Sequence, residues 1–424
     1  MTINLNSLIQ KELINEYAGS EKKRTVVING EKYLLKMPDP VREKNRMLSY
    51  INNSYSEYVG CKIFKMLGMP VQEVIIGSYY DGKKDKIACA CKDIRKPNET
   101  LLNADLVIKG LFPDVPDIDF NVGFELLSQV ADLLPLDNGE YLFTKNDLID
   151  FYSKQFIIDA LIGNEDRHNG NWGFIRNDMN LNVPTYKIAP VFDCGSCLSP
   201  LYSDEELTAS NLSNDINNTQ SALRDVKGRK IHYRDYIIST VNQDVNRALK
   251  DIIKRIDIST IAAFINDIDC ISEQRKDYYI GLIVGRYEAI LIPTLEKLSQ
   301  VDVTFKDNAC QHKTEQEKTD ILYRFIKPIR QTKPGSCGNF KMDNTKYEYR
   351  RVKGQKILVY NEETAFVLPI KNDYESVEDI IARCAKESQN LGFKLILENQ
   401  PNKTVSDSSS IEEADIEYEC GPEL

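Results

Sequence analysis

Residues 163–171 read Gly-Asn-Glu-Asp-Arg-His-Asn-Gly-Asn, and the triplet Asp193-Cys194-Gly195 starts 22 residues after Asn171. The apolar periodicity predicts an amphipathic helix over residues 147–162, ended by Gly163. A strand–turn–strand unit is predicted between the loop and the triplet, at residues 172–175 and 185–191. The second of these strands leads into Asp193, so the loop and the triplet are expected to serve one pocket.

The residue types in this pocket suit phosphoryl transfer, which depends on the close placement of charges. Asp166 is the candidate catalytic base beside an acceptor hydroxyl. Asn171 and Asp193 are the candidate metal ligands, because an amide oxygen and a carboxylate suit Mg²⁺ and not zinc. A polar loop that only caps a helix is the alternative, but the helix, the hairpin and the Asp-x-Gly triplet together favour the functional interpretation.

Three neighbours in the same motif have structural interpretations. We expect Trp172 to pack under the loop and His168 to organise it through hydrogen bonds. Arg167 either neutralises a phosphate or pairs with a neighbouring acid, and the sequence leaves both open.

The first 95 residues are predicted to form a small β-rich unit. The turn dipeptide Asn29-Gly30 indicates a hairpin. By alternation and turn chemistry we expect four or five strands and one helix, with strands at 24–28, 31–37, 71–80 and 86–91 and the helix at 56–67.

The upstream half of a phosphate site is predicted in this unit. Residues 18–20, Ala-Gly-Ser, form a polar turn that can offer backbone N–H groups to phosphates, although many such turns are only turns. Lys36 interrupts an apolar strand and can reach the phosphates, with Glu57 as its carboxylate partner. The alternatives are a solvated edge lysine and a first-turn acid that complements the helix dipole.

These motifs resemble those of the HipA-like serine/threonine kinases over residues 10–300, and a compact member of that family has a similar layout. The resemblance implies a two-lobed protein-kinase-like fold of α+β class, with a small β-rich N-lobe and a mainly helical C-lobe. It also implies ATP and Mg²⁺ as cofactors, transfer to Ser or Thr, and autophosphorylation.

The resemblance assigns roles residue by residue. Asp166 is the catalytic base, and Asn171 and Asp193 are the metal ligands. The nucleotide-binding residues are then Gly19, Ser20 and Lys23 at the phosphates, Lys36 with Glu57, and Cys89 and Cys91 in a hinge that faces the adenine.

We expect four regions along the chain. The N-lobe takes residues 1–95, and the C-lobe takes 96–304, with helices at 123–134, 147–162, within 233–257, 259–268 and 273–298. A small α+β accessory domain of unknown role is predicted at 305–404. An acidic, disordered tail follows at 405–424.

The accessory domain begins with a basic segment, which holds 13 basic and 6 acidic residues between Lys306 and Lys356. Aromatic residues are interleaved with these charges, so RNA or an acidic protein is a possible partner. An ordinary solvated basic face is the simpler interpretation.

Composition excludes several classes of protein. The net charge of −10 argues against binding nucleic acid over the whole surface. No apolar run reaches the length of a membrane span, and the first residues lack a signal peptide, so we expect a cytoplasmic protein. The Cys194/Cys197 pair has zinc spacing, but the chain has only three histidines, so buried free thiols are expected.

Two other functions fit some of the motifs. Phosphoinositide kinases share the Asp-Arg-His-x-x-Asn pattern, but no polybasic membrane anchor is evident. A non-catalytic kinase-like binding module is the second alternative, although every residue that the chemistry needs is present.

Overall fold

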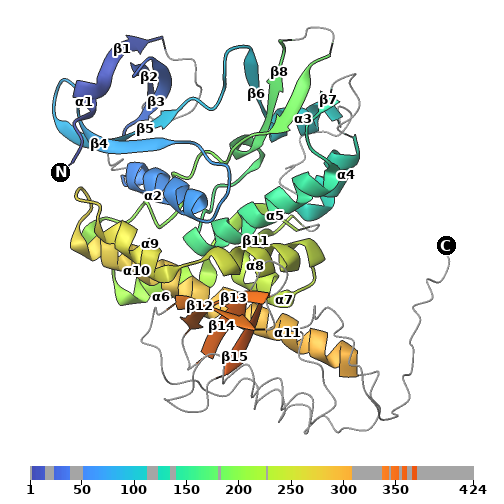
Figure 1. The fold of residues 1–424 in the computed structure, drawn as a ribbon. Coiled ribbons are helices and arrows are strands. Elements are labelled where there is room, and N and C mark those ends of the chain that lie inside the picture. The colour runs from blue at the N-terminus through green and yellow to red at the C-terminus, as the bar shows by residue number, and fades with distance from the viewer. Residues whose placement is uncertain are drawn as a thin grey trace, which may run out of the picture.

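The structure is a computed structural model. It describes residues 2–14, 23–38, 51–111, 123–133, 140–179, 183–225, 228–307, 337–342, 345–352, 356–360 and 365–369. Figure 1 shows a β-rich part at the N-terminus, a larger helical part below it, and a second sheet at the far end.

The N-terminal part is an antiparallel five-stranded sheet of order β1-β2-β3-β5-β4. Its strands are β1 (Ile9–Leu13), β2 (Lys23–Ile28), β3 (Glu31–Lys36), β4 (Val74–Tyr80) and β5 (Asp85–Lys92). The predicted hairpin is confirmed, because Asn29 and Gly30 both have positive φ, at 51° and 79°, between β2 and β3. Two residues with positive φ match the twist that a tight hairpin needs.

The two faces of this sheet have different partners. Leu35 and Met37 are buried in a small core on one face, together with Leu5 of α1 (Leu5–Leu8). Because side chains alternate along a strand, Lys36 points to the opposite face. That face is covered by helix α2 (Asn53–Met66).

Helix α2 links the sheet to the helical part. Its residues Val59, Ile63 and Phe64 belong to one continuous core that also contains residues of α5 (Lys145–Ile162) and α8 (Gln243–Arg255). The helix starts three residues before the predicted start at Ser56, so Glu57 lies in its second turn. The interpretation of Glu57 as a first-turn acid is therefore wrong.

The helical part contains the predicted helices with small changes of boundary. Helix α5 begins with a capping box between Thr144 and Asp147 and ends at Gly163, which has φ 66°. The stretch predicted as one helix from 273 to 298 is α10 (Glu273–Arg286), a π-helical turn (Tyr287–Leu291) and α11 (Ile292–Asp307). The other helices are α3 (Ala104–Leu111), α4 (Phe124–Leu133), α6 (Ala209–Asn218), α7 (Tyr233–Ser239) and α9 (Ile258–Asn266).

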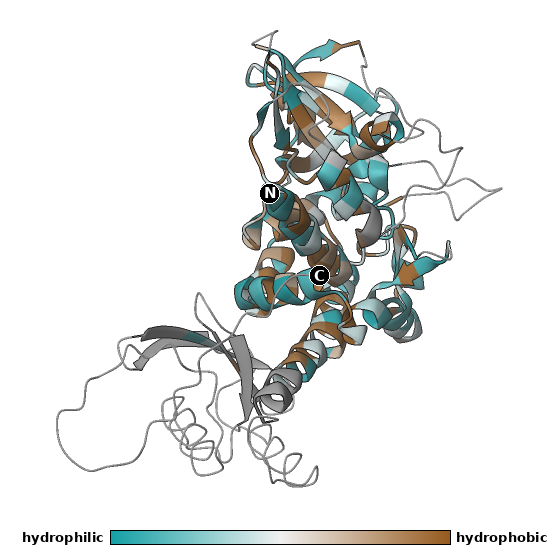
Figure 2. Ribbon diagram, turned by 90° about the vertical axis from the view of Figure 1, so that its right-hand side faces the viewer, coloured by the Kyte–Doolittle hydropathy of each residue, from teal (hydrophilic) through white to brown (hydrophobic). Residues whose placement is uncertain are grey.

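Two smaller sheets flank these helices. One has the order β6-β8-β9-β7 and consists of β6 (Glu99–Asn103), β7 (Glu140–Tyr141), β8 (Gly173–Asn177) and β9 (Thr185–Ile188). The hairpin β8–β9 is the predicted strand–turn–strand unit. The other sheet pairs β10 (Gln220–Arg224) with β11 (Lys230–His232). Figure 2 shows apolar residues along the strands of the N-terminal sheet and the helices below it.

The C-terminal sheet is an antiparallel meander. Its strands are β12 (Cys337–Met342), β13 (Thr345–Val352), β14 (Lys356–Tyr360) and β15 (Ala365–Pro369), and β15 lies against α11 and α8. The end of the predicted accessory domain, from residue 370 to 404, and the acidic tail lie outside the described residues. Most of the basic segment lies outside them as well, so its partner and the four domain boundaries stay predictions.

Among the helices that the structure describes, none has the length and apolarity required to span a membrane.

Candidate active site

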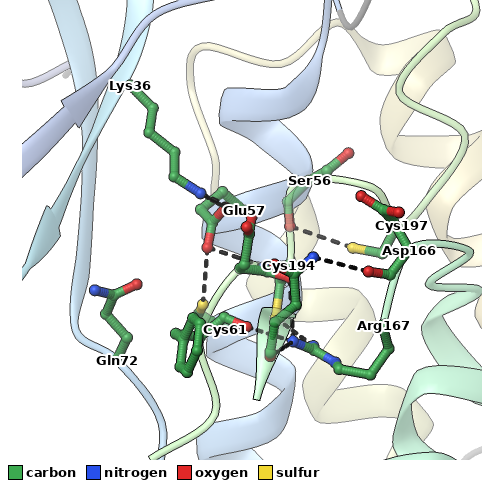
Figure 3. Close-up of polar contacts among 12 residues, drawn as sticks. Lys36, Ser56, Glu57, Cys61, Gln72, Asp166, Arg167, Cys194 and Cys197 are labelled. Atoms are coloured by element: carbon green, nitrogen blue, oxygen red, sulfur yellow. Dashed lines mark hydrogen bonds and ion pairs between the residues drawn. The ribbon is translucent and has the colours of Figure 1, made fainter. Parts of the chain in front are cut away.

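Three charged side chains from distant parts of the chain meet at the centre of the molecule. Nζ of Lys36 lies 2.7 Å from Oε2 of Glu57 and 2.9 Å from Oδ1 of Asp193. Lys36 comes from the last position of β3, Glu57 from α2, and Asp193 from the loop after β9 (Figure 3 shows the first two). The predicted partnership of Lys36 and Glu57 is present in the geometry.

Glu57 also holds the loop that carries Asp193. It is fully buried, and its Oε1 accepts hydrogen bonds from the backbone nitrogen of Cys194 at 3.0 Å and from the thiol of Cys61 at 3.7 Å. Both carboxylate oxygens are therefore used inside the protein. Glu57 orients Lys36 and the loop and has no direct access to a ligand.

Asp193 has the properties of a metal ligand. Its backbone lies in the left-handed region, with φ 58°, and its side chain is 35% exposed. Burial alone would raise the pKa of this carboxyl, but the nearby positive charges, chiefly Lys36 with smaller effects of Lys23 and Arg167, together lower the pKa to about 2. The group is therefore a carboxylate at every physiological pH, as a hard cation requires.

The loop at 163–171 is held in place by its own polar residues. The side-chain oxygen of Asn164 accepts a hydrogen bond from the backbone nitrogen of Asp166 at 3.1 Å. The amide nitrogen of Asn171 donates to the carbonyl of Asp166 at 2.8 Å, so the amide oxygen of Asn171 is the atom left for a metal. The spacing of five residues thus brings the candidate base and the candidate ligand together.

The carboxylate of Asp166 is half exposed, and among the described residues its nearest ion-pair contact is Nε2 of His168, at 3.9 Å. Burial raises its pKa, and the nearby charge of Asp193 adds to this, while His168 and Lys230 act in the opposite direction. A carboxylate with a raised pKa is a better proton acceptor than an ordinary aspartate.

His168 and Trp172 support the loop as expected. Nδ1 of His168 accepts a hydrogen bond of 2.9 Å from the backbone nitrogen of Gly170. Trp172 is buried, donates to the side chain of Asn169 at 3.0 Å, and its ring lies 4.9 Å from that of Tyr152.

The structure decides between the two roles of Arg167. Its side chain is buried and its Nε lies 2.9 Å from Oδ2 of Asp159 on α5. Arg167 therefore pairs with an internal acid and is not directed at a phosphate. Sequence analysis missed Asp159, although one signal was present, namely an acid inside the apolar run Ile157 to Ile162.

The predicted nucleotide-binding residues are placed as follows. Gly19 and Ser20 lie outside the described residues. Lys23 begins β2, pairs with Lys36 in the sheet register, and is near enough to Asp193 to help lower its pKa. The predicted contacts of Gly19, Ser20 and Lys23 with the phosphates of a nucleotide stay predictions.

Cys89 and Cys91 are buried within β5, which is paired with β3 on one side and with β4 on the other. The connection to the helical part starts after Lys92. A contact of the two cysteines with adenine stays a prediction.

Cys194 and Cys197 are both buried and neither forms a disulfide. Within the described part of the chain, no cluster of three or more His, Cys, Asp or Glu side chains has the arrangement of a metal site.

A Lys–Glu pair between a sheet and a helix, an Asp after a hairpin, and a loop with Asp and Asn define a phosphotransferase of the kinase-like fold. Comparison with known proteins gives the family. The chain is 36% identical over 276 residues to the serine/threonine-protein kinase CtkA of Helicobacter pylori, covering 63% of this chain and 80% of the relative. The chain belongs to the family of CtkA-type serine/threonine kinases.

The solved structure of CtkA agrees with this assignment. The crystal structure of the H. pylori proinflammatory kinase CtkA matches with a TM-score of 0.59 and 29% identity, over 69% of this chain and 97% of that one. A HipA structure from Shewanella oneidensis MR-1, determined with HipB and operator DNA, matches with a TM-score of 0.40 and 15% identity, over 66% and 65% of the two chains. No protein-family model matches the sequence.

Proposed function

We propose that this kinase uses ATP with Mg²⁺, transfers the γ-phosphate to Ser or Thr hydroxyls of a protein substrate, and phosphorylates itself. The observation that carries the proposal is the double ion pair of Lys36, whose Nζ lies 2.7 Å from Glu57 and 2.9 Å from Asp193. A lysine held by a helix carboxylate beside a candidate metal ligand is the arrangement that positions the phosphates of ATP in kinases.

The donor set fits the cofactors. Asn171 and Asp193 offer an amide oxygen and an ionised carboxylate, which are the oxygen ligands that Mg²⁺ takes in proteins. Bound Mg²⁺ would offset the negative charge of the phosphates. Lys36 would add a second positive charge, fixed by Glu57.

Asp166 has the role of catalytic base. Its carboxylate is accessible, and the hydrogen bond that its backbone nitrogen donates to the side-chain oxygen of Asn164 fixes the loop around it. The side chain would accept the proton of the substrate hydroxyl as that oxygen bonds to the γ-phosphorus of ATP and the bond from this phosphorus to the leaving ADP oxygen breaks. Its raised pKa favours this acceptance.

Acceptor preference tests the proposal against lipid phosphorylation. The purified chain is incubated with Mg-ATP and either a pool of Ser/Thr peptides or vesicles that contain phosphoinositides, and each product is identified by mass spectrometry. We expect phosphopeptides and phosphorylated sites on the chain itself. Phosphorylated lipid without phosphopeptide would overturn the proposal.

Asp166→Asn serves as the matched control, because it keeps the shape of the side chain and removes the base. Nucleotide binding by the parent chain without transfer to any acceptor would instead favour a kinase-like binding module.

A further inference from the structure

One guanidinium lies behind both candidate metal ligands. Nη1 of Arg167 donates to the backbone carbonyl of Asn171 at 2.9 Å and to that of Asp193 at 3.2 Å. The same nitrogen also donates to the carbonyl of Phe192. The two ligands come from separate segments, on either side of the β8–β9 hairpin, and Arg167 joins the backbones of both segments directly.

The other side of the guanidinium is fixed to the core. Nε and Nη2 of Arg167 donate hydrogen bonds to the two carboxylate oxygens of Asp159, at 2.9 and 3.2 Å. Figure 3 shows the position of Arg167 beside Cys194. Asp159 is 1% exposed and belongs to the long helix α5, and it also accepts a bond of 3.0 Å from the side chain of Asn164. Nη1 has two N–H groups for three carbonyls, so one of these bonds is shared between two acceptors, while Nε and Nη2 each bond to Asp159.

Asp193 needs such support. A residue other than glycine with φ near 58° keeps that conformation only where its surroundings determine it. Arg167 holds the carbonyl of Asp193 while Lys36 holds its carboxylate. The direction of the Asp193 side chain relative to Asn171 therefore depends on Arg167.

We propose that Arg167, held by Asp159, is a positioning residue that sets the separation of Asn171 and Asp193 so that both can bind one Mg²⁺. The inference rests on the proposed function, because it assumes that these two residues bind the metal. Arg167 has no part in proton transfer and is not directed at the nucleotide.

Arg167→Lys tests this role, because lysine keeps the positive charge and lacks the planar fork. The readouts are the Mg²⁺ concentration that gives half-maximal phosphoryl transfer at saturating ATP, and the affinity for a fluorescent ATP analogue in EDTA. Loss of a residue that orients metal ligands costs about 10- to 100-fold in metal affinity. We expect the half-saturating Mg²⁺ concentration to rise by that factor while the affinity in EDTA stays unchanged.

A second buried arginine supplies the control. Arg275 on α10 is 2% exposed and its Nε lies 2.9 Å from Oδ1 of Asp204, whose side chain is partly exposed. The printed hydrogen bonds of the Arg275 side chain go to residues 202 and 204 and not to either candidate ligand. Arg275→Lys is expected to lower stability and to leave the Mg²⁺ requirement at the value of the parent. Asp159→Asn is the second test variant, with an expected shift in the same direction as Arg167→Lys.

The outcomes are distinct. A raised Mg²⁺ requirement in the Arg167 and Asp159 variants alone supports the inference. A parent-like requirement in both folded variants, or an equal rise in Arg275→Lys, would overturn it while leaving the proposed function intact. A parent chain whose transfer does not depend on Mg²⁺ would overturn the proposed function and this inference with it.

Discussion

Glu57 accepts a hydrogen bond of 3.0 Å from the backbone nitrogen of Cys194, the residue after Asp193. Its other carboxylate oxygen holds Lys36 at 2.7 Å. One buried side chain therefore connects the sheet, helix α2 and the loop that carries the candidate metal ligand. The geometry of the site depends on this connection. Substitutions can therefore test the bonds of Glu57 to Lys36 and to the backbone of Cys194.

Lys36→Met is expected to destabilise the protein and to abolish phosphoryl transfer. Glu57 is fully buried, so the substitution leaves a carboxylate inside the protein without its ammonium partner. Breaking a buried pair in this way costs about 3–5 kcal/mol. Urea denaturation should show a loss of this size, and the double variant Lys36→Met/Glu57→Gln should recover a large part of it. A double variant no more stable than the single one would contradict this account.

Asp166→Asn and Asp193→Asn are expected to change stability in opposite directions at neutral pH. The folded-state pKa of Asp166 is raised, chiefly by burial, so its favourable contribution exists only at low pH and is lost as pH rises through that pKa. Removing its charge should raise the melting temperature.

The charge of Asp193 stabilises the folded protein at neutral pH, whereas that of Asp166 destabilises it. Against the effect of burial, the nearby positive charges, chiefly Lys36, hold the pKa of Asp193 at about 2, so its contribution is present at neutral pH and is lost as pH falls through that value. Removing this charge should lower the melting temperature. Thermal melts at pH 7 check both variants, and shifts of the same sign would count against the assigned environments.

Lys230→Gln is expected to move the acidic limb of the pH–rate profile to higher pH. Burial raises the pKa of Asp166, and the charge of Lys230 on β11 is one of the groups that lower it. Without this charge the base stays protonated to higher pH, so activity falls on the acidic side and is unchanged well above the pKa. Arg247→Gln on α8 removes an exposed cation paired with Asp244 and serves as the control, with an unshifted profile.

Gly60→Ala is expected to disturb the site through packing. A Cβ at Gly60 of α2 would lie 2.8 Å from Cβ of Cys194 and 2.9 Å from Sγ of Cys197. Overpacking of this kind costs about 1–3 kcal/mol, and here it would move α2 away from the Asp193 loop. Gly110→Ala on α3 meets nothing within 4 Å and should be neutral or stabilising by about 0.5–1 kcal/mol. Equal melting temperatures and equal activity for the two variants would exclude this packing effect.

The sequence predicts the parts of the site whose geometry is local. Asp166 and Asn171 share one loop, and the bond between them follows from their spacing within that loop. The hairpin after the loop was predicted from its strands, and it delivers Asp193. Lys36 was recognisable as a charge within an apolar strand, although its distance to Asp193 depends on the tertiary fold.

The start of α2 and helix α6 depend on tertiary contacts, and the sequence gives little indication of either. The start of α2 contains Asn53 and Ser54, which are typical of turns, yet both are buried in the structure. Helix α6 is short and polar and was not predicted. Its Asp215 accepts hydrogen bonds from Ser199 and from Tyr278, the latter at 2.9 Å, so partners outside the helix fix it in place.

Phosphate transfer itself tests the central claim most directly. The purified parent chain and Asp166→Asn are incubated with Mg-ATP, with and without EDTA, and their intact masses are measured. The account predicts whole phosphoryl additions on the parent chain in the presence of Mg²⁺, and none in Asp166→Asn or in EDTA. Equal phosphorylation of the parent and Asp166→Asn would contradict it.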